Sequence, residues 1–387
     1  MRLLFVSNLY PSQSEPTRGL PNARLARHFA PEHEARVLVA RPRFLPPYAD
    51  GIRQQADAPL AEDAALAPRV VHVPYAPKIG SLLNHILYAR GMRRAFAAAV
   101  DEARPDAVLV AWLFPDTCGI LRLARSRKLP VFGIAQGSDA HQYLDLPWRR
   151  RVILAGCART AGIITRSQAL AERLGQAGVP AAKLRTVYNG VETDLFRPGD
   201  PAAARQTLGL PPDRKLVLYV GNLLPIKNPA LLLEAFARLD GSPELVYVGD
   251  GELRESLRQQ AQTLGIADRV RLAGAQTPGQ VVRHMQAADL LVVPSRNEGL
   301  PNVLREAFAC GLPVVATDVG GIREIVTEEW LGTLVPSENP AALAAALASR
   351  LEQTPETARI RRHAEGFSWS RCVAECLEFI RERTARV

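Results

Sequence analysis

Residues 290–317 read LLVVPSRNEGLPNVLREAFACGLPVVAT. This segment begins with an apolar run, passes through a loop rich in turn residues, enters a helix at about Asn302 and ends in a second apolar run at 314–317. The order predicts a strand, a helix and a second, parallel strand of the same sheet. Because both runs are apolar on each face of the strand, we expect helices to cover both faces of that sheet.

The same alternation of short apolar runs and longer helical segments extends outward over the whole chain, in two series. Strands of the first series are predicted at 3–7, 35–39, 70–73, 107–112, 131–135, 162–165 and 184–187, with helices near 20–30, 80–103, 116–128, 148–158 and 168–177. Strands of the second series are predicted at 216–220, 245–248, 270–273, 290–293, 314–317 and 333–335. We therefore predict an α/β protein with two doubly wound parallel sheets, a cleft between them, and ligands at the carboxyl ends of the strands.

Two stretches interrupt this alternation. The stretch 188–212 is rich in turn residues and prolines, and it separates the two series. We therefore predict one domain at 1–193 and a second domain that begins at 194. The segment 42–69 contains five prolines and has weak periodicity, so we expect a long loop or excursion there.

The charge of the chain is divided unevenly. The 387 residues include 48 Lys and Arg against 39 Asp and Glu, a formal net charge of +9. Residues 1–190 hold 26 basic and 14 acidic side chains, a net +12, whereas residues 191–387 hold 22 and 25, a net −3. An acidic partner is therefore expected to meet the first half. No basic–aromatic recognition module accompanies this charge, so we expect no nucleic acid.

The sequence also indicates a compartment. No apolar run approaches the roughly 18 residues of a membrane-spanning helix, so we expect none. The apolar run 3–6 is broken by Ser7 and Asn8 before it reaches the length of a signal-peptide core. Five scattered cysteines fit a reducing compartment better than a disulfide framework. These features predict a cytoplasmic protein.

The loop 294–301 is the strongest candidate site, because it joins a strand end to a helix start. The backbone N–H groups of residues 300–304 and the helix dipole favour a phosphate there. Glu298 precedes the helix, and Glu306 lies about one turn inside it. Two carboxylates that faced a phosphate would repel it, so we expect each to bind hydroxyl groups on either side, as in a sugar nucleotide. The alternative is that Asn302 only caps the helix and that both glutamates are solvated charges.

The segment from Glu298 to Glu306 closely resembles the E-x7-E signature of family-4 retaining glycosyltransferases of the GT-B fold. Further likeness, over nearly the whole chain, lies in YNGV and FRP within 188–198, VGDG at 248–251 and FSW at 367–369. The resemblance implies two Rossmann-like domains, 1–193 and 194–366, that face each other across a cleft. It also implies a C-terminal helix in 367–387 that crosses back to the first domain.

The resemblance further implies a donor site in the second domain. It places the diphosphate on Lys227 and on the backbone of Gly299, Leu300, Pro301 and Asn302, which are contiguous. It places the ribose on Glu306 and hydroxyls of the donor sugar on Glu298. A lysine after the first strand of this domain can meet a diphosphate as a compact charge.

Several positions depart from the family pattern. Asn222 stands where the family usually carries an arginine for the diphosphate. Gly19 matches one glycine of a pair near the donor phosphates, and Leu20 replaces the other. Gln136 replaces a histidine beside the reacting sugar, and Gln136 cannot shuttle a proton. Asp139, in the same QGSD motif, matches.

His141 is a second histidine near this motif and is open to two interpretations. It compensates for Gln136, or it is an exposed loop residue, which we favour. The resemblance implies transfer with retention by front-face displacement, in which the leaving phosphate oxygen takes the acceptor proton, with no metal ion or other cofactor.

The expected partners are a UDP- or GDP-sugar donor and an anionic or lipid-linked glycan acceptor. The start SNLYP at 7–11 most resembles enzymes that build cell-surface polysaccharides. Two segments combine basic and apolar residues and could lie on an anionic membrane surface. They are Leu82, Leu83, Ile86 and Leu87 followed by Arg90, Arg93 and Arg94, and PWRRR at 147–151. The alternative is that these leucines face the domain core.

Other functions lack their motifs in this chain. It has no G-x-x-x-x-G-K-[ST] loop, no Asp-x-Asp pair and no complete G-x-G-x-x-G after a suitable strand. The main alternative is a degenerate relative that binds a sugar nucleotide as the non-catalytic partner of another transferase. Asn222, Gln136 and Leu20 favour that alternative, whereas Glu298, Glu306 and Lys227 favour an enzyme.

Overall fold

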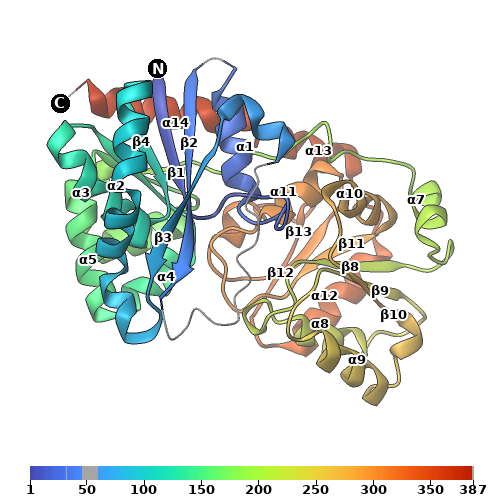
Figure 1. Cartoon of the computed structure of the whole chain (residues 1–387). Helices are drawn as coiled ribbons and strands as arrows, with labels where there is room; N and C mark the ends of the chain where they lie inside the picture. The colour runs from blue at the N-terminus through green and yellow to red at the C-terminus, as the bar shows by residue number, and fades with distance from the viewer. Residues whose placement is uncertain (32, 46–59, 386–387) are drawn as a thin grey trace. The chain divides into compact units, whose positions relative to one another are not determined.

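The computed structural model describes residues 1–31, 33–45 and 60–385, and the chain forms two compact units. Met1–Gly190 and Trp369–Val387 make up unit 1, and Val191–Ser368 make up unit 2 (Figure 1). The chain therefore leaves the first unit once and returns to it once. Both crossings lie within a few residues of the domain boundaries expected from the sequence.

Unit 1 contains a seven-stranded parallel sheet in the order β3-β2-β1-β4-β5-β6-β7. Its strands are β1 (Arg2–Ser7), β2 (Glu34–Phe44), β3 (Arg69–Tyr75), β4 (Ala107–Ala111), β5 (Val131–Ala135), β6 (Gly162–Thr165) and β7 (Leu184–Thr186). The order reverses between β1 and β4. Ligands of doubly wound sheets bind beyond the carboxyl ends of the strands at such a reversal.

Helices cover both faces of this sheet. They are α1 (Leu20–Phe29), α2 (Asn84–Ala103), α3 (Cys118–Ala124), α4 (Ser138–His141), α5 (Pro147–Arg159), α6 (Gln168–Gln176) and α14 (Trp369–Thr384). Successive residues of a strand point to opposite faces. Leu3 and Phe5 of β1 accordingly join a buried cluster with α1 and α14, while Leu4 and Val6 join one with α2 and α3.

Helix α14 is an integral part of unit 1. Its buried side chains recur every three or four residues and form one apolar face; they are Trp369, Cys372, Val373, Cys376, Leu377, Phe379 and Ile380. The Phe379 ring lies edge-on to that of Phe132 in β5, with centroids 6.0 Å apart. The position of Gly162 in β6 leaves room for Phe379, since a Cβ there would lie 2.6 Å from this ring.

Unit 2 contains a six-stranded parallel sheet in the order β10-β9-β8-β11-β12-β13. Its strands are β8 (Leu216–Val220), β9 (Glu244–Val248), β10 (Val270–Gly274), β11 (Leu290–Val293), β12 (Val314–Thr317) and β13 (Gly332–Val335). Its helices are α7 (Pro201–Leu208), α8 (Pro229–Phe236), α9 (Arg254–Thr263), α10 (Pro278–Ala287), α11 (Asn302–Ala309), α12 (Pro340–Glu352) and α13 (Thr357–Glu365). Here the order reverses between β8 and β11, which are neighbours in the sheet.

The structure confirms each predicted strand and the α/β class. The prediction that the whole of 42–69 is a loop was wrong at both ends of that segment. Strand β2 continues to Phe44, and a 3-10 helix occupies Ala61–Leu66. Pro42 is tolerated in β2 because it lies past Val39, the last partner of β1, where β2 has a neighbour on one side only. Residues 46–59 lie outside the described residues. Among the described residues, none of the helices combines the length and apolar character needed to span a membrane.

Candidate functional site

Two loops of unit 2 meet because β8 and β11 are adjacent. The loop after β8 forms a 3-10 turn, Pro225–Lys227, and the loop after β11 carries Glu298. Lys227 Nζ donates to Glu298 Oε1 at 2.6 Å. The backbone N–H of Arg296 donates to the carbonyl of Ile226 at 2.9 Å and fastens the two loops together. The structure therefore unites two residues that the sequence analysis assigned to different parts of the donor.

Glu298 is held from its own loop as well. Its side chain is 8% exposed, and Oε1 also accepts a hydrogen bond from Ser295 Oγ at 2.7 Å. Ser295 is in turn held by Thr317 at the end of β12, whose Oγ1 donates to the Ser295 carbonyl at 2.6 Å. A buried carboxylate with two donors has one orientation, so Glu298 is preorganised. No sequence pattern had indicated a role for Ser295 or Thr317.

The loop after β12 supports Glu298 from the other side. The N–H of Gly321 donates to the carbonyl of Gly299 at 2.9 Å. Gly320 has φ +56°, and a Cβ on it would lie 1.8 Å from the carbonyl oxygen of Glu298. Only glycine fits this position. The Gly-Gly pair at 320–321, separated by two residues from a predicted strand, was the available signal in the sequence.

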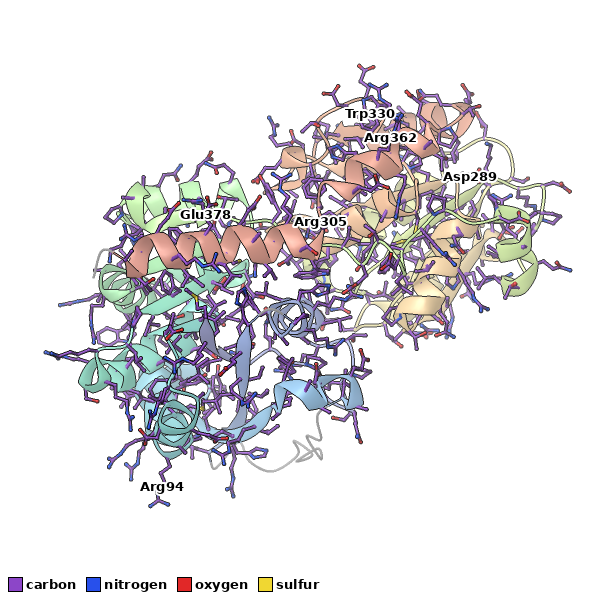
Figure 2. The ribbon with its side chains drawn as sticks, turned by 90° about the horizontal axis from the view of Figure 1, so that it is seen from above. Arg94, Asp289, Arg305, Trp330, Arg362 and Glu378 are labelled. Atoms are coloured by element: carbon purple, nitrogen blue, oxygen red, sulfur yellow. The ribbon has the colours of Figure 1, made fainter. Side chains whose placement is uncertain are left out.

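Helix α11 begins as expected at Asn302, immediately after the Glu298 loop. Pro301, in extended conformation, is its N-cap residue, so the alternative with Asn302 as the cap was wrong. The Asn302 side chain instead accepts from Arg305, a buried residue labelled in Figure 2. The first turn of an α-helix directs N–H groups outward, so this start suits an anion. Leu300 is buried beside it, and Glu306 is half-buried one turn further on.

Asn222 lies in the loop after β8, which packs against the loop after the neighbouring strand β9. The N–H of Gly221 donates to the Val248 carbonyl at 2.9 Å, and a Cβ on Gly249 would lie 1.9 Å from the Gly221 oxygen. Tyr219 donates its hydroxyl to the Asn222 carbonyl at 2.8 Å. Burial, and after it the charge of Glu298, raises the pKa of the Tyr219 phenol. The exposed Asn222 side chain is thus carried by a loop close to the Lys227–Glu298 pair.

The QGSD motif of unit 1 follows β5 and is organised by Asp139. This side chain is fully buried, and Oδ1 accepts from the backbone N–H groups of Gln136 at 3.0 Å and Gly137 at 2.9 Å. Oδ2 accepts from the N–H of Leu113, after β4, at 3.0 Å. Asp139 therefore joins the loops that follow two adjacent strands. With both oxygens engaged, it acts on the position of Gln136 and not as a free acid or base.

The buried Asp139 makes the stability of unit 1 depend on pH. Burial raises the pKa of this carboxyl to about 6, although the backbone hydrogen bonds oppose the shift. The folded pKa lies above the unfolded value, so the unfolded protein releases this proton first as the pH rises. Urea unfolding should therefore show that the stability of wild type, relative to Asp139→Asn, falls by about 2 kcal/mol from pH 4 to pH 7. If the difference in unfolding free energy between wild type and Asp139→Asn were the same at each pH, the raised pKa of Asp139 would be contradicted.

Gln136 and Gly19 are brought together through Asn22, which the sequence analysis missed. Gln136 Nε2 donates to Asn22 Oδ1 at 2.8 Å, and Asn22 Nδ2 donates to the Leu9 carbonyl at 2.8 Å. Gly19 has φ +68° and precedes α1, and a Cβ on it would lie 2.2 Å from the Leu9 carbonyl carbon. The close approach at Gly19 is therefore to the chain after β1.

The favoured interpretation of His141 was wrong. The residue ends the short helix α4 and is half-buried. Burial, and after it Arg173, lowers its pKa, so the ring is neutral at pH 7.

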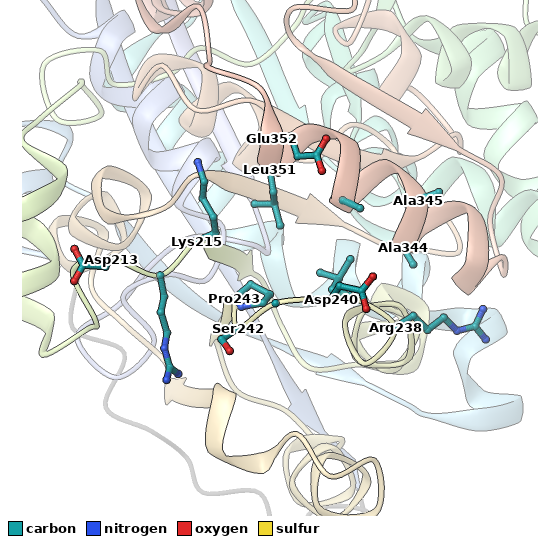
Figure 3. A pocket seen from close by; sticks show the side chains of 14 residues that line it. Asp213, Lys215, Arg238, Asp240, Ser242, Pro243, Ala344, Ala345, Leu351 and Glu352 are labelled. Atoms are coloured by element: carbon teal, nitrogen blue, oxygen red, sulfur yellow. The ribbon is translucent and has the colours of Figure 1, made fainter.

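A hollow of unit 2 lies at the opposite end of the strands, beside the amino ends of β8 and β9. It has a volume of about 780 Å³ and is lined by residues 213–215, by 238–243 and by one side of α12 (Figure 3). Strands β8 and β9 begin here, whereas the Glu298 loop follows the end of β11. None of the residues expected to bind the donor lines this hollow.

Two family models match the chain, one in each half. "Glycosyltransferase Family 4" matches residues 22–195, and "Glycosyl transferases group 1" matches residues 201–367. Together the two models cover every strand of both sheets except β1.

Curated relatives are named D-inositol 3-phosphate glycosyltransferase. The protein from Thermobispora bispora is 33% identical over 297 residues, which are 72% of this chain and 69% of that protein. The one from Segniliparus rotundus is 35% identical over 276 residues, 67% of this chain. The chain spans only 60% of the length of this second relative.

Solved structures share the fold over nearly the whole chain. Anabaena Alr3699/HepE, in complex with UDP, has a TM-score of 0.77 and 22% identity, with 99% of this chain and 100% of that chain covered. Sucrose-phosphate synthase from Thermosynechococcus elongatus has a TM-score of 0.78 and 22% identity, with 100% of each chain covered. The fold of this chain is therefore GT-B.

Proposed function

The chain belongs to glycosyltransferase family 4, and on that premise we propose that it transfers a sugar from a nucleoside diphosphate donor to an acceptor hydroxyl. The observation that carries this proposal is the Lys227–Glu298 pair at the start of α11. The pair sets a cation and an oriented carboxylate beside a helix N-terminus. The cation and the helix dipole suit the diphosphate, and the carboxylate suits sugar hydroxyls.

In the proposed donor complex, Lys227 and the backbone of residues 299–302 bind the diphosphate. Lys227 has three N–H donors, so it can donate to the diphosphate and keep its bond to Glu298. Glu298 binds hydroxyls of the donor sugar, and Glu306 binds the ribose. Asn222 can add an amide contact but not the charge of an arginine. A UDP-sugar is the favoured donor, supported by the fold shared with Anabaena Alr3699/HepE, whose structures are described with UDP and UDP-glucose.

We propose that the reaction retains the configuration of the anomeric carbon. Fixed N–H dipoles and Lys227 stabilise the charge that develops on the leaving diphosphate, so the proposed step needs no metal ion. The leaving phosphate oxygen takes the proton of the acceptor hydroxyl on the same face of the sugar. Gln136 then has only to orient the reacting groups, and Asp139 and Asn22 position Gln136.

We propose an anionic acceptor in cell-surface polysaccharide or glycolipid synthesis, at the cytoplasmic face of the membrane. The net charge of +12 on residues 1–190 supports an anionic acceptor. The names of the relatives favour a second acceptor, a phosphorylated polyol such as D-inositol 3-phosphate. A lipid-linked glycan phosphate and a polyol phosphate are both anionic, so the charge fits either one.

Turnover of UDP-glucose and GDP-mannose should be measured for wild type and Lys227→Ala, with D-inositol 3-phosphate and with lipid extract as acceptors. We expect wild-type turnover and, in Lys227→Ala, a donor KM about 10- to 100-fold higher, because a charge-assisted hydrogen bond is lost. The variant Lys215→Ala, at the opposite end of the strands, serves as control and should match wild type. Turnover should be followed by NMR.

Two results would refute parts of this proposal. If the protein binds a donor but turns over none of the donors with either acceptor, it is a degenerate, non-catalytic member of the family. A product with inverted anomeric configuration would refute retention.

A further inference from the structure

Unit 1 exposes a cluster of large apolar side chains. Nine such residues are exposed among the described residues, and five of them lie in two short segments. Leu82, Leu83 and Ile86 belong to the 3-10 turn Lys78–Leu83 and the first turn of α2. Leu146 and Trp148 belong to the start of α5. The alternative in which these leucines face the core was therefore wrong for Leu82 and Leu83, whose exposed fractions are 36% and 53%.

The two segments form one surface. Trp148 Nε1 donates to the carbonyl of Leu82 at 3.2 Å, across 66 residues of sequence. This bond holds the indole ring of Trp148, a residue that is 44% exposed, beside the exposed leucines. We call these five residues the apolar tip of unit 1.

Basic residues adjoin the apolar tip. Along the exposed side of α2, Ile86 is followed after one turn by Arg90 and after two turns by Arg93 and Arg94, all exposed. Figure 2 shows Arg94 pointing away from the ribbon. On α5, Arg150 and Arg151 are exposed in the turn after Trp148.

Acidic residues are missing from both segments. Residues 64–100 and 146–171 contain ten Lys or Arg and no Asp or Glu. Asp145, which directly precedes Leu146 in the sequence, is paired with Arg173. Arg149 is engaged differently from its neighbours, because its guanidinium lies 4.3 Å from the centre of the Tyr143 ring.

We infer that the apolar tip and its arginines dock unit 1 on an anionic lipid surface. Exposed leucines and a tryptophan enter the boundary between head groups and acyl chains, while arginines one to two turns away meet the lipid phosphates. An acidic protein would complement the arginines but not the protruding apolar side chains. The inference deepens the proposed lipid-linked acceptor, because it states which surface of unit 1 meets the membrane. Docking itself requires no sugar transfer.

Co-sedimentation with vesicles of phosphatidylcholine, with and without phosphatidylglycerol, tests this inference. Wild type should sediment with the anionic vesicles, and salt should release it. Leu83→Asn should bind about tenfold more weakly, as expected for the lost burial of one leucine. Arg94→Gln should bind about fivefold more weakly, as expected for one basic residue near the surface. Leu264→Asn and Arg238→Gln, exposed residues of unit 2, are the matched controls and should bind like wild type.

Trp148 provides a second measurement. Its emission should shift to shorter wavelength with anionic vesicles, and the shift should be lost in Trp148→Phe. Equal binding of wild type, Leu83→Asn and Arg94→Gln, or no binding of wild type, would overturn the inference. Concentration-dependent dimerisation that Leu83→Asn abolishes would overturn it in favour of a second copy of the chain. Glu298→Gln should bind vesicles like wild type, so failure of docking and failure of transfer are separable.

Discussion

Glu298→Gln is expected to lower kcat/KM for sugar transfer by about 100- to 1,000-fold, the usual cost of losing one preorganised electrostatic contact. In the structure Glu298 Oε1 accepts from both Lys227 and Ser295. A glutamine keeps the size of the side chain but removes its charge, so Lys227 loses its ionic partner. The neutral amide also accepts weaker hydrogen bonds from the sugar hydroxyls than a carboxylate does.

The measurement is steady-state transfer from UDP-glucose, together with thermal melting to establish that Glu298→Gln folds. Glu255→Gln is the matched control, because Glu255 forms an exposed pair with Arg258 in the same unit. Such surface pairs contribute little, so this variant should behave like wild type. If Glu298→Gln kept wild-type kcat/KM, Glu298 would have no part in the reaction.

Gly320→Ala is expected to disable the donor site and to destabilise unit 2. The added Cβ would lie 1.8 Å from the carbonyl oxygen of Glu298, so the backbone of the Glu298 loop must move. The substitution also strains a residue with φ +56°, which costs about 1–2 kcal/mol in itself. We expect a total loss in the free energy of unfolding of about 3–5 kcal/mol. We also expect loss of the stabilisation by UDP-glucose.

Gly265→Ala separates the collision from the backbone strain. Gly265 has φ +69° in the same unit, but no atom lies within 4 Å of a Cβ built there. This control should lose only the strain energy and should still respond to UDP-glucose. Urea unfolding and thermal melting with and without UDP-glucose give both quantities. Equal losses in the two variants would show that contact with Glu298 is unimportant.

The candidate site was only partly visible in the sequence. The strand–loop–helix pattern of 290–309 is local, so it located both Glu298 and the start of α11. Lys227 was found because it follows a predicted strand. Thr317, Gly320 and Asn22 were missed, because each acts through a partner on another loop, and no local pattern indicates which loops are neighbours. Ser295 was missed although it lies in the same loop as Glu298.

The sequence by itself determined the α/β class, the two sheets and their strands. Apolar runs of strand length and apolar repeats of helical period are properties of short segments, and folding does not alter them. The tertiary structure alone decided the contacts that join distant segments. Lys227 meets Glu298 across 71 residues, Gln136 meets Asn22 across 114, and Trp148 meets Leu82 across 66. These contacts depend on which strand ends and helix starts become neighbours, and the order of strands in each sheet, not the order along the chain, sets those neighbours.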